Sequence, residues 1–193
     1  MATASPSPLL DQDAGFGEAG DGVVVEAVFG QNFAGVGGEL RRGRLHAAGG
    51  AGEGLVFTSL YGVYDLTMAA RDVNGGTDPD RTLRYDFATG DHPLARPESG
   101  AVWVGTAVTH WPDGSESAET AAYVFGREGE RQLSGCTYRT IPVKVTFMDD
   151  QGWVAQDMLY FADFGLSVTT GRQRVTDRAP RWRALAGLVA VTP

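Results

Sequence analysis

The sequence predicts an all-β protein, either an antiparallel curved sheet, a half-open barrel or a β-sandwich, with about nine or ten strands. Apolar and polar residues alternate with period two in several stretches between Val23 and Thr170, which is typical of strands. Segments rich in Gly, Asp, Asn and Pro, the residues that favour turns, separate these stretches. No segment of about 12 residues has the i, i+3, i+4, i+7 apolar spacing of an amphipathic helix.

The clearest strands lie between Cys136 and Gly171. From residue 141 to residue 148 every second side chain is apolar, and Asp149-Asp150-Gln151-Gly152 follows as a tight turn, since glycine tolerates positive φ. The returning strand is expected from Trp153 to Phe161. After a bend at residues 162–165, a third strand is expected from Leu166 to Thr170. This region therefore predicts an antiparallel meander.

The rest of the chain adds shorter strands and connections. The alternation predicts strands in this order: Val23–Gly30, Leu40–Ala48, Gly54–Ala70 (one long strand, or two bent at Gly62), Leu83–Phe87, Ala101–Trp111 and Glu119–Gly126. The connections are expected at residues 72–80, 88–100, 112–115 and 128–132, the last as a charged turn.

At 193 residues the chain fits one domain with a sizeable core. Residues 1–21 contain few large apolar side chains and are expected to form a flexible arm. Residues 22–175 are expected to form a single β domain. Residues 176–193 begin in a polar, arginine-rich stretch and are expected to form a tail or an edge strand.

Composition limits the classes of partner. The net charge of −8 argues against nucleic acid, because a phosphate-binding surface needs a basic stripe. No apolar run approaches the roughly 20 residues that span a bilayer as a helix, so no integral membrane segment is expected. The first ten residues, MATASPSPLL, lack the features of an export signal. We therefore expect a periplasmic or secreted protein if a signal was removed from this chain, and a cytoplasmic one otherwise.

Neither a metal nor a cofactor is predicted. Two acidic loops, beginning at Asp11 and Asp72, suggest calcium loops, but their twelfth positions are Gly22 and Leu83 where such a loop needs a glutamate. The glycine-rich segment 35–38 lacks the third glycine of a dinucleotide-binding loop, and no amphipathic helix follows it.

No catalytic motif is present, so no catalytic residue is assigned. His92 is expected in a loop, His110 at a strand end, packed or facing water, and Cys136 as a small buried residue. The enzyme alternative is a hydrolase or isomerase whose site uses His92, His110 or Cys136 in an arrangement that the sequence does not reveal. A further alternative is a cytosolic assembly module.

Residues 136–171 carry a family resemblance. The pattern consists of C-T-Y-R-T-I-P-V, an apolar strand, a D-x-x-G turn, a second strand and L-Y-F-A-D-F-G-L. It resembles uncharacterised periplasmic β-proteins of proteobacteria, which are related to clam-like carriers of lipid or lipoprotein acyl chains. Those proteins have a Y-x-P-x-L-G-L-like turn, which Tyr160 and residues 163–166 match here, with Ala162 in place of the usual proline. The resemblance covers about a fifth of the chain. It implies a curved sheet and an apolar ligand, and no catalytic residues.

Together these observations favour a non-enzymatic envelope β-protein that binds an apolar ligand, such as a lipid or acyl chain, or a partner protein. A curved sheet has a concave face that side chains or a ligand must fill. The alternative is that two sheets close on each other and the same side chains form an ordinary core. Seven large side chains are predicted to line the concave face: Tyr61, Tyr64, Met68, Trp103, Phe125, Met158 and Tyr160.

Overall fold

The computed structural model describes six segments of the chain, residues 23–28, 40–47, 55–71, 77–88, 93–133 and 135–182, and they contain strands and turns without a helix. The described strands are β1 (Val23–Val28), β2 (Leu40–Ala47), β3 (Leu55–Leu60), β4 (Tyr64–Arg71), β5 (Thr77–Ala88), β6 (Val102–His110), β7 (Glu116–Phe125), β8 (Gly129–Leu133), β9 (Cys136–Asp149), β10 (Gly152–Phe161), β11 (Leu166–Arg174) and β12 (Arg181–Trp182).

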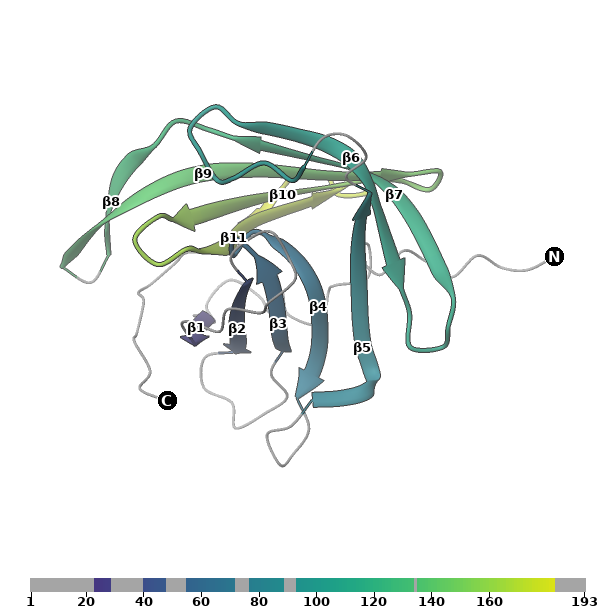
Figure 1. The fold of residues 1–193 in the computed structure, drawn as a ribbon. Coiled ribbons are helices and arrows are strands. Elements are labelled where there is room, and N and C mark those ends of the chain that lie inside the picture. Colours follow the sequence, from purple (N-terminus) through teal and green to yellow (C-terminus); the bar gives the residue numbers. More distant parts are fainter. Residues whose placement is uncertain are drawn as a thin grey trace.

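All of these strands belong to one antiparallel sheet. The order is β1-β2-β3-β4-β5-β6-β7-β9-β10-β11-β12, and β8 pairs with the first half of β9 outside this path. Figure 1 shows that the sheet curls, with β6 to β11 as a broad curved layer and β1 to β5 turning beneath it. The ends of the order, β1 and β12, are not paired with each other, so the sheet stays open.

The predicted fold class is confirmed: the protein is an all-β, antiparallel curved sheet. The described residues hold twelve strands because two short ones, β8 and β12, add to the longer strands that alternation identified. Residues 128–132 were predicted as a charged turn, and this is wrong, since Gly129–Leu133 pairs with β9. Alternation gave no signal there because both faces of β8 are solvent-exposed, so polar residues occupy successive positions.

The segment 54–70 forms two strands, β3 and β4, that reverse at Tyr61-Gly62. Both residues have positive φ, 56° and 69°, and the amide of Val63 donates to the carbonyl of Leu60 at 3.1 Å, as in the tight turns that suit antiparallel hairpins. The β10–β11 turn packs directly on this reversal. Gly62 accepts two hydrogen bonds from Ser167, one from its amide at 2.9 Å and one from its hydroxyl at 2.6 Å.

We call this the turn–turn contact, comprising residues 61–62 and 165–167. It joins the lower layer to the upper one across 105 positions of sequence. A Cβ atom at Gly62 would overlap the carbonyl oxygen of Gly165, so the backbones approach as closely as glycine permits.

The meander formed as predicted in its main features. The side chains of β9 alternate between buried and exposed from Ile141 to Met148, and the Asp149 carboxylate accepts from the amides of Gln151 and Gly152 in the turn. The third strand is longer than predicted, since β11 continues through Arg174. A small second cluster packs around the β10–β11 turn: Leu159, Phe161, Leu166 and Val168, with Leu133, Tyr138 and Phe164 at its margin.

Asp163 anchors the β10–β11 turn to β9. Its carboxylate accepts from the backbone amide of Arg139 and pairs with the Arg139 side chain, each at 2.8 Å. These hydrogen bonds hold the pKa of Asp163 below its ordinary value, the backbone amide contributing most. The segment 160–166 thus has a structural role in this chain: it positions the upper half of the turn–turn contact.

Candidate ligand-binding site

The inward faces of β6, β7 and β9 present a continuous row of buried side chains. On β7 the buried positions are Glu119, Ala121, Tyr123 and Phe125, and the intervening side chains point outward. Cross-strand pairing aligns the rows, with Trp103 opposite Tyr123 and Ala121 opposite Phe147. Strict alternation therefore determines which side chains of β6, β7 and β9 point towards β4 and β5.

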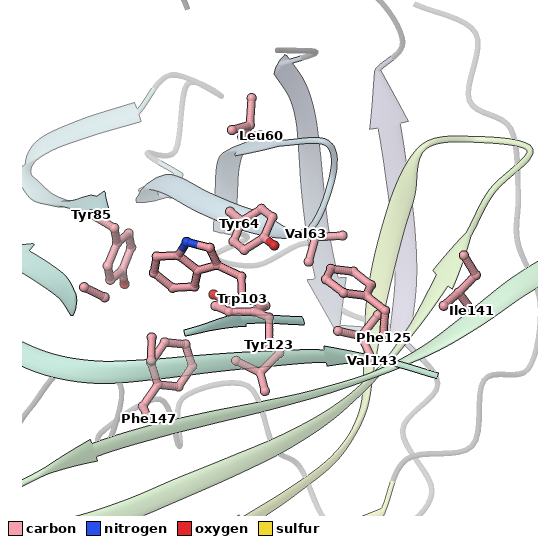
Figure 2. Close-up of a cluster of buried hydrophobic side chains, with 13 residues drawn as sticks. Leu60, Val63, Tyr64, Tyr85, Trp103, Tyr123, Phe125, Ile141, Val143 and Phe147 are labelled. Carbon is pink, nitrogen blue, oxygen red and sulfur yellow. The ribbon is translucent and has the colours of Figure 1, made fainter. Parts of the chain in front are cut away.

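Tyr64 of β4 lies at the centre of an aromatic cluster on this face (Figure 2). Its ring centroid lies 4.4 Å from that of Tyr123, and its hydroxyl donates to the carbonyl of Ala95 at 2.9 Å. Phe87, Trp103 and Phe125 complete the contacts around the Tyr64 ring, mostly in edge-on or tilted geometry. Burial raises the pKa of Tyr64 above its ordinary value, so the phenol stays neutral.

The structure brings all seven predicted lining residues to this cluster, from four strands of the sheet and the turn between β3 and β4. Three of them, Tyr64, Trp103 and Phe125, are buried within it. The other four are partly exposed and pack against it; we call them the margin: Tyr61, Met68, Met158 and Tyr160. At one point of the margin the Arg96 guanidinium lies 5.5 Å from the centre of the Tyr61 ring.

A group of polar side chains lies on the same inward face, beyond the aromatic residues. We call Thr109, Ser117 and Glu119 the polar belt. Thr109 lies directly opposite Ser117 in the β6–β7 register, and Glu119 is one inward position further along β7. On its other side Thr109 lies opposite Tyr85 of β5, whose side chain is also buried.

The polar belt is almost sealed from solvent. Thr109 is 1% exposed and Glu119 is 4% exposed. Within the described residues, the Thr109 and Ser117 hydroxyl oxygens are enclosed and have no hydrogen-bond partner. Such oxygens are uncommon in folded proteins.

Glu119 is the ionisable group of the belt. Burial, followed by the nearby Asp149 carboxylate, raises the pKa of Glu119 to about 7. Asp65 of β4 keeps partial contact with solvent, yet the surrounding protein raises its pKa to about 7 as well. Burial raises the pKa of Tyr123, and the neighbouring Asp65 and Glu119 carboxyl groups raise it further, as do the phenols of Tyr64 and Tyr85. Burial at Glu119 and Asp65 therefore disfavours the charged carboxylate at these two positions.

Sequence reasoning missed the belt. A strand was predicted from Glu119 to Gly126, but the glutamate was not assigned to the inward face. Counting back in steps of two from Tyr123 places Glu119 and Ser117 on the buried side. The signal was thus present in the sequence, and the polar character of the residues concealed it.

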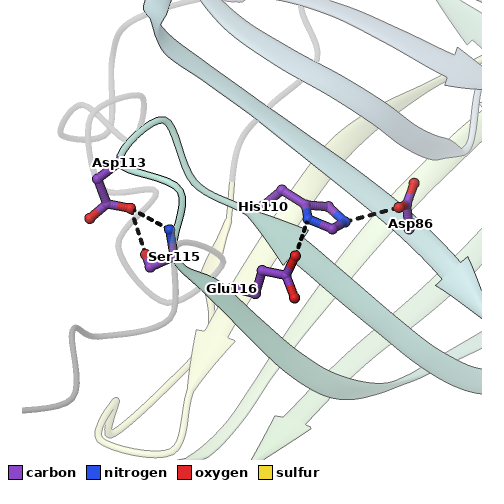
Figure 3. Close-up of polar contacts among 5 residues, drawn as sticks. All are labelled: Asp86, His110, Asp113, Ser115 and Glu116. Atoms are coloured by element: carbon purple, nitrogen blue, oxygen red, sulfur yellow. Dashed lines mark hydrogen bonds and ion pairs between the residues drawn. The ribbon is translucent and has the colours of Figure 1, made fainter.

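The catalytic candidates do not come together. His110, at the end of β6, has Nε2 at 2.9 Å from Asp86 and Nδ1 at 3.0 Å from Glu116, on the solvent side of the sheet (Figure 3). Both ring nitrogens are thus engaged with carboxylates. In the adjoining turn, the Ser115 hydroxyl and amide donate to Asp113 and lower its pKa.

Cys136 begins β9, and the antiparallel register of β6, β7 and β9 puts it at the opposite end of the sheet from His110. The prediction that Cys136 is buried is wrong: the thiol is exposed, because β9 starts in the exposed hairpin with β8. His92 lies outside the described residues.

Beyond this face, the outward surface carries an apolar strip on β6, β7 and β9. We call Val102, Val104, Val124 and Met148 the outer strip; their side chains are 46–60% exposed. Val102 and Val124 are direct cross-strand partners. Single exposed apolar residues are ordinary, whereas adjacent ones mark a surface that another molecule can cover.

In the described segments, no three His, Cys, Asp or Glu side chains are grouped so as to hold a metal ion. Across the same segments, no helix has the length and apolar character needed to span a bilayer.

Comparisons with protein-family models, with curated proteins and with solved structures each gave no match. The resemblance of residues 136–171 to periplasmic lipid carriers therefore stays a prediction, and the inward face itself is the basis for inferring function.

Proposed function

We propose that this protein is a non-enzymatic binding protein that holds an apolar ligand, such as an acyl chain, against the aromatic cluster on the concave face of its curved sheet. The observation that carries the proposal is the convergence of seven large side chains from distant strands on one cluster. Four of them form a partly exposed margin, where an apolar molecule can gain contact area without unfolding the buried centre.

Binding at the margin has a plausible driving force. Each methylene group removed from water contributes roughly 0.8 kcal/mol. Two margin residues are methionines, Met68 and Met158, whose unbranched side chains adapt to ligands of differing shape. We further propose that the protein acts in the bacterial envelope, as the proteins that residues 136–171 resemble do; a cytoplasmic location is the alternative if the chain carries no export signal.

Titration with a fluorescent fatty acid and native mass spectrometry of the freshly purified protein test this proposal. Met158→Trp fills the margin and should weaken binding about tenfold or more, since a bulky ring occupies the space of the chain. Met148→Trp is the matched control, because Met148 lies in the outer strip and the substitution is the same. No adduct and no saturable fluorescence at micromolar protein would reject ligand binding.

The outer strip favours a second candidate function, which is contact with another protein. We propose that this partner is a second copy of this chain. Thr120 of β7 and Lys144 of β9 point outward beside the strip. No carboxylate lies on the outward face of these two strands between those residues and the strip. In a chain of net charge −8, a surface without carboxylates is where two copies repel each other least. Sedimentation should then show a dimer that Val104→Lys dissociates; a monomer at all concentrations rejects this candidate.

A further inference from the structure

Arg96 is an exposed residue beside the aromatic cluster, and its backbone is held in place on both sides. The preceding residue, Ala95, packs against the cluster and accepts the Tyr64 hydroxyl at 2.9 Å. The Arg96 carbonyl accepts from the amide of Glu98 at 2.7 Å. Pro97, which lies between them, restricts the backbone of both itself and Arg96. A constrained segment therefore presents this guanidinium at the edge of the cluster.

Tyr61, a member of the margin, lies under the Arg96 side chain. The centre of its ring is 5.5 Å from the guanidinium carbon. Among the described residues, Tyr61 is also the only one other than glycine with positive φ, at 56°. A bulky residue in this conformation costs stability and persists only where its surroundings hold it there, and such strain is concentrated at functional positions. The strain and the cation thus coincide at one point of the margin.

The charge of Arg96 is not matched by a carboxylate of the described segments. Within them, its guanidinium contacts the Tyr61 ring and forms no ion pair, whereas Arg139 pairs with Asp163 at 2.8 Å. Exposed arginines without partners are ordinary, so the location of Arg96 beside partly exposed apolar side chains is what distinguishes it. A guanidinium offers five N–H donors in a planar fork that fits the two oxygens of a carboxylate.

We propose that Arg96 binds the carboxylate of the ligand, and that the ligand is a free fatty acid whose chain lies along the margin. The inference rests on the proposed function and specifies the ligand class for the same face. Both carboxylate oxygens accept hydrogen bonds from the guanidinium fork, while the Tyr61 ring stays against the other side of the same cation. The carboxylate remains at the solvent side of the cluster, so its charge is not buried.

The margin continues from Tyr61 along β10, which gives the chain its path. Gly62 accepts from Ser167, and Ser167 is the direct cross-strand partner of Tyr160. Tyr160 and Met158 are successive inward residues of β10, roughly 7 Å apart along the strand. The cation therefore lies at the end of the margin from which two partly exposed side chains lead inward, the order that a head group followed by a hydrocarbon chain requires.

The test compares three probes of equal chain length, decanoic acid, decan-1-ol and n-decylamine, by titration calorimetry at pH 8, where the acid is ionised and the amine is protonated. We expect the acid to bind at least about tenfold more tightly than the alcohol, because a hydrogen bond to a charged group exceeds a neutral one by roughly that factor. The amine should bind most weakly, since it brings a like charge to Arg96.

Two variants and one control locate the head group. Arg96→Gln should reduce the affinity for the acid to that for the alcohol and leave the alcohol affinity unchanged. Arg96→Lys keeps the charge but loses the planar fork, so it should retain a preference of several-fold for the acid. Arg131→Gln removes the same charge from the exposed strand β8 and should leave the acid affinity unchanged. Far-ultraviolet dichroism verifies that each variant is folded.

The outcomes separate the two proposals. If none of the three probes binds, the proposed function itself fails. The carboxylate assignment is overturned, while binding of apolar ligands stands, if the alcohol binds and the acid is no tighter, or if Arg96→Gln leaves the preference for the acid intact. A loss of that preference in Arg131→Gln as large as in Arg96→Gln would also overturn it, because net charge rather than a local contact would then be responsible.

Discussion

At the scale of single residues, Gly62 meets two requirements that no other residue type meets together. It occupies a left-handed conformation in the β3–β4 turn, and its Cα faces the backbone of Gly165 with no space for a side chain. Gly114, in the β6–β7 turn, also has positive φ, but a Cβ atom there would meet nothing within 4 Å. Substitutions at Gly62 and Gly114 therefore distinguish the effect of backbone strain, which both share, from the effect of steric overlap, which only Gly62 has.

We predict that Gly62→Ala lowers the free energy of unfolding by about 3 kcal/mol or more, because left-handed strain and backbone overlap add. Gly114→Ala, which retains only the strain, should cost about 1–2 kcal/mol. Urea denaturation of both variants measures the difference. If both variants lose the same free energy of unfolding, the turn–turn contact accommodates a methyl group at Gly62, which would contradict the prediction.

Glu119 makes stability depend on pH. Its folded pKa of about 7 lies above the ordinary value of 4.5, so the folded state binds the proton more tightly than the unfolded state does. The contribution of Glu119 to stability is therefore greatest below about pH 4.5. It falls as the pH rises from there to about 7, and it does not change at higher pH. The shift corresponds to about 3 kcal/mol.

We predict that Glu119→Gln flattens the loss of stability between pH 5 and pH 7 and is more stable than the parent protein at pH 8. Asp65 retains its own contribution of the same sign, so the slope should not vanish. Thermal unfolding across this pH range provides the measurement, with Glu130→Gln on the exposed strand β8 as the control. A parent protein whose stability does not fall from pH 5 to pH 7 would contradict a raised pKa at this position.

At the scale of elements, β9 has two halves with different surroundings. From Thr140 to Phe147 its inward side chains belong to the core, and β7 and β10 flank it. From Cys136 to Arg139 it pairs with β8, whose side chains are mostly exposed. Backbone hydrogen bonds are present in both halves, but the first half contributes several buried side chains to the core, whereas the second contributes only Tyr138, at the margin of the second cluster.

We predict that the amides of β8 and of residues 136–138 exchange with solvent hydrogen much faster than those of residues 141–147, because the end of the hairpin can open without disturbing the core. Hydrogen exchange resolved by peptide mass or by nuclear magnetic resonance measures the rates. Equal protection in both halves of β9 would mean that the hairpin opens only when the whole sheet unfolds.

At the scale of the whole molecule, the two layers share one core. Tyr64 and Phe87 from the lower layer interlock with Trp103, Tyr123 and Phe125 from the upper one, and the turn–turn contact ties the layers at one end. Neither layer buries its aromatic face without the other. This arrangement makes the described sheet one cooperative unit although its edges do not join.

We therefore predict a single unfolding transition. Tryptophan fluorescence, which includes Trp103 in the core, and far-ultraviolet dichroism, which reports the whole sheet, should give coincident curves in urea. A strand content that falls before the fluorescence changes would indicate that the lower layer melts separately.

The sequence by itself determined the local part of this structure. Period-two alternation from Ile141 to Met148 identified the buried face of β9, and the Asp149–Gly152 turn fixed its partner β10. The large side chains that fill the interior, such as Tyr64 and Trp103, were recognisable from their size and their place in alternating strands. These features follow from the pleat of a strand and the chemistry of a turn, both of which act over a few residues.

The tertiary structure decided which distant segments meet. Alternation says which side chains share a face, but the curl of the sheet determines which of those faces become buried. Glu119 and Thr109 became interior groups because β4 and β5 turn beneath β6 and β7, and Gly62 became indispensable because Gly165 packs on it. Cys136 stayed in solvent because its part of β9 extends past that curl. Such contacts arise from closing loops of up to a hundred residues, for which a sequence of alternating strands carries no local signal.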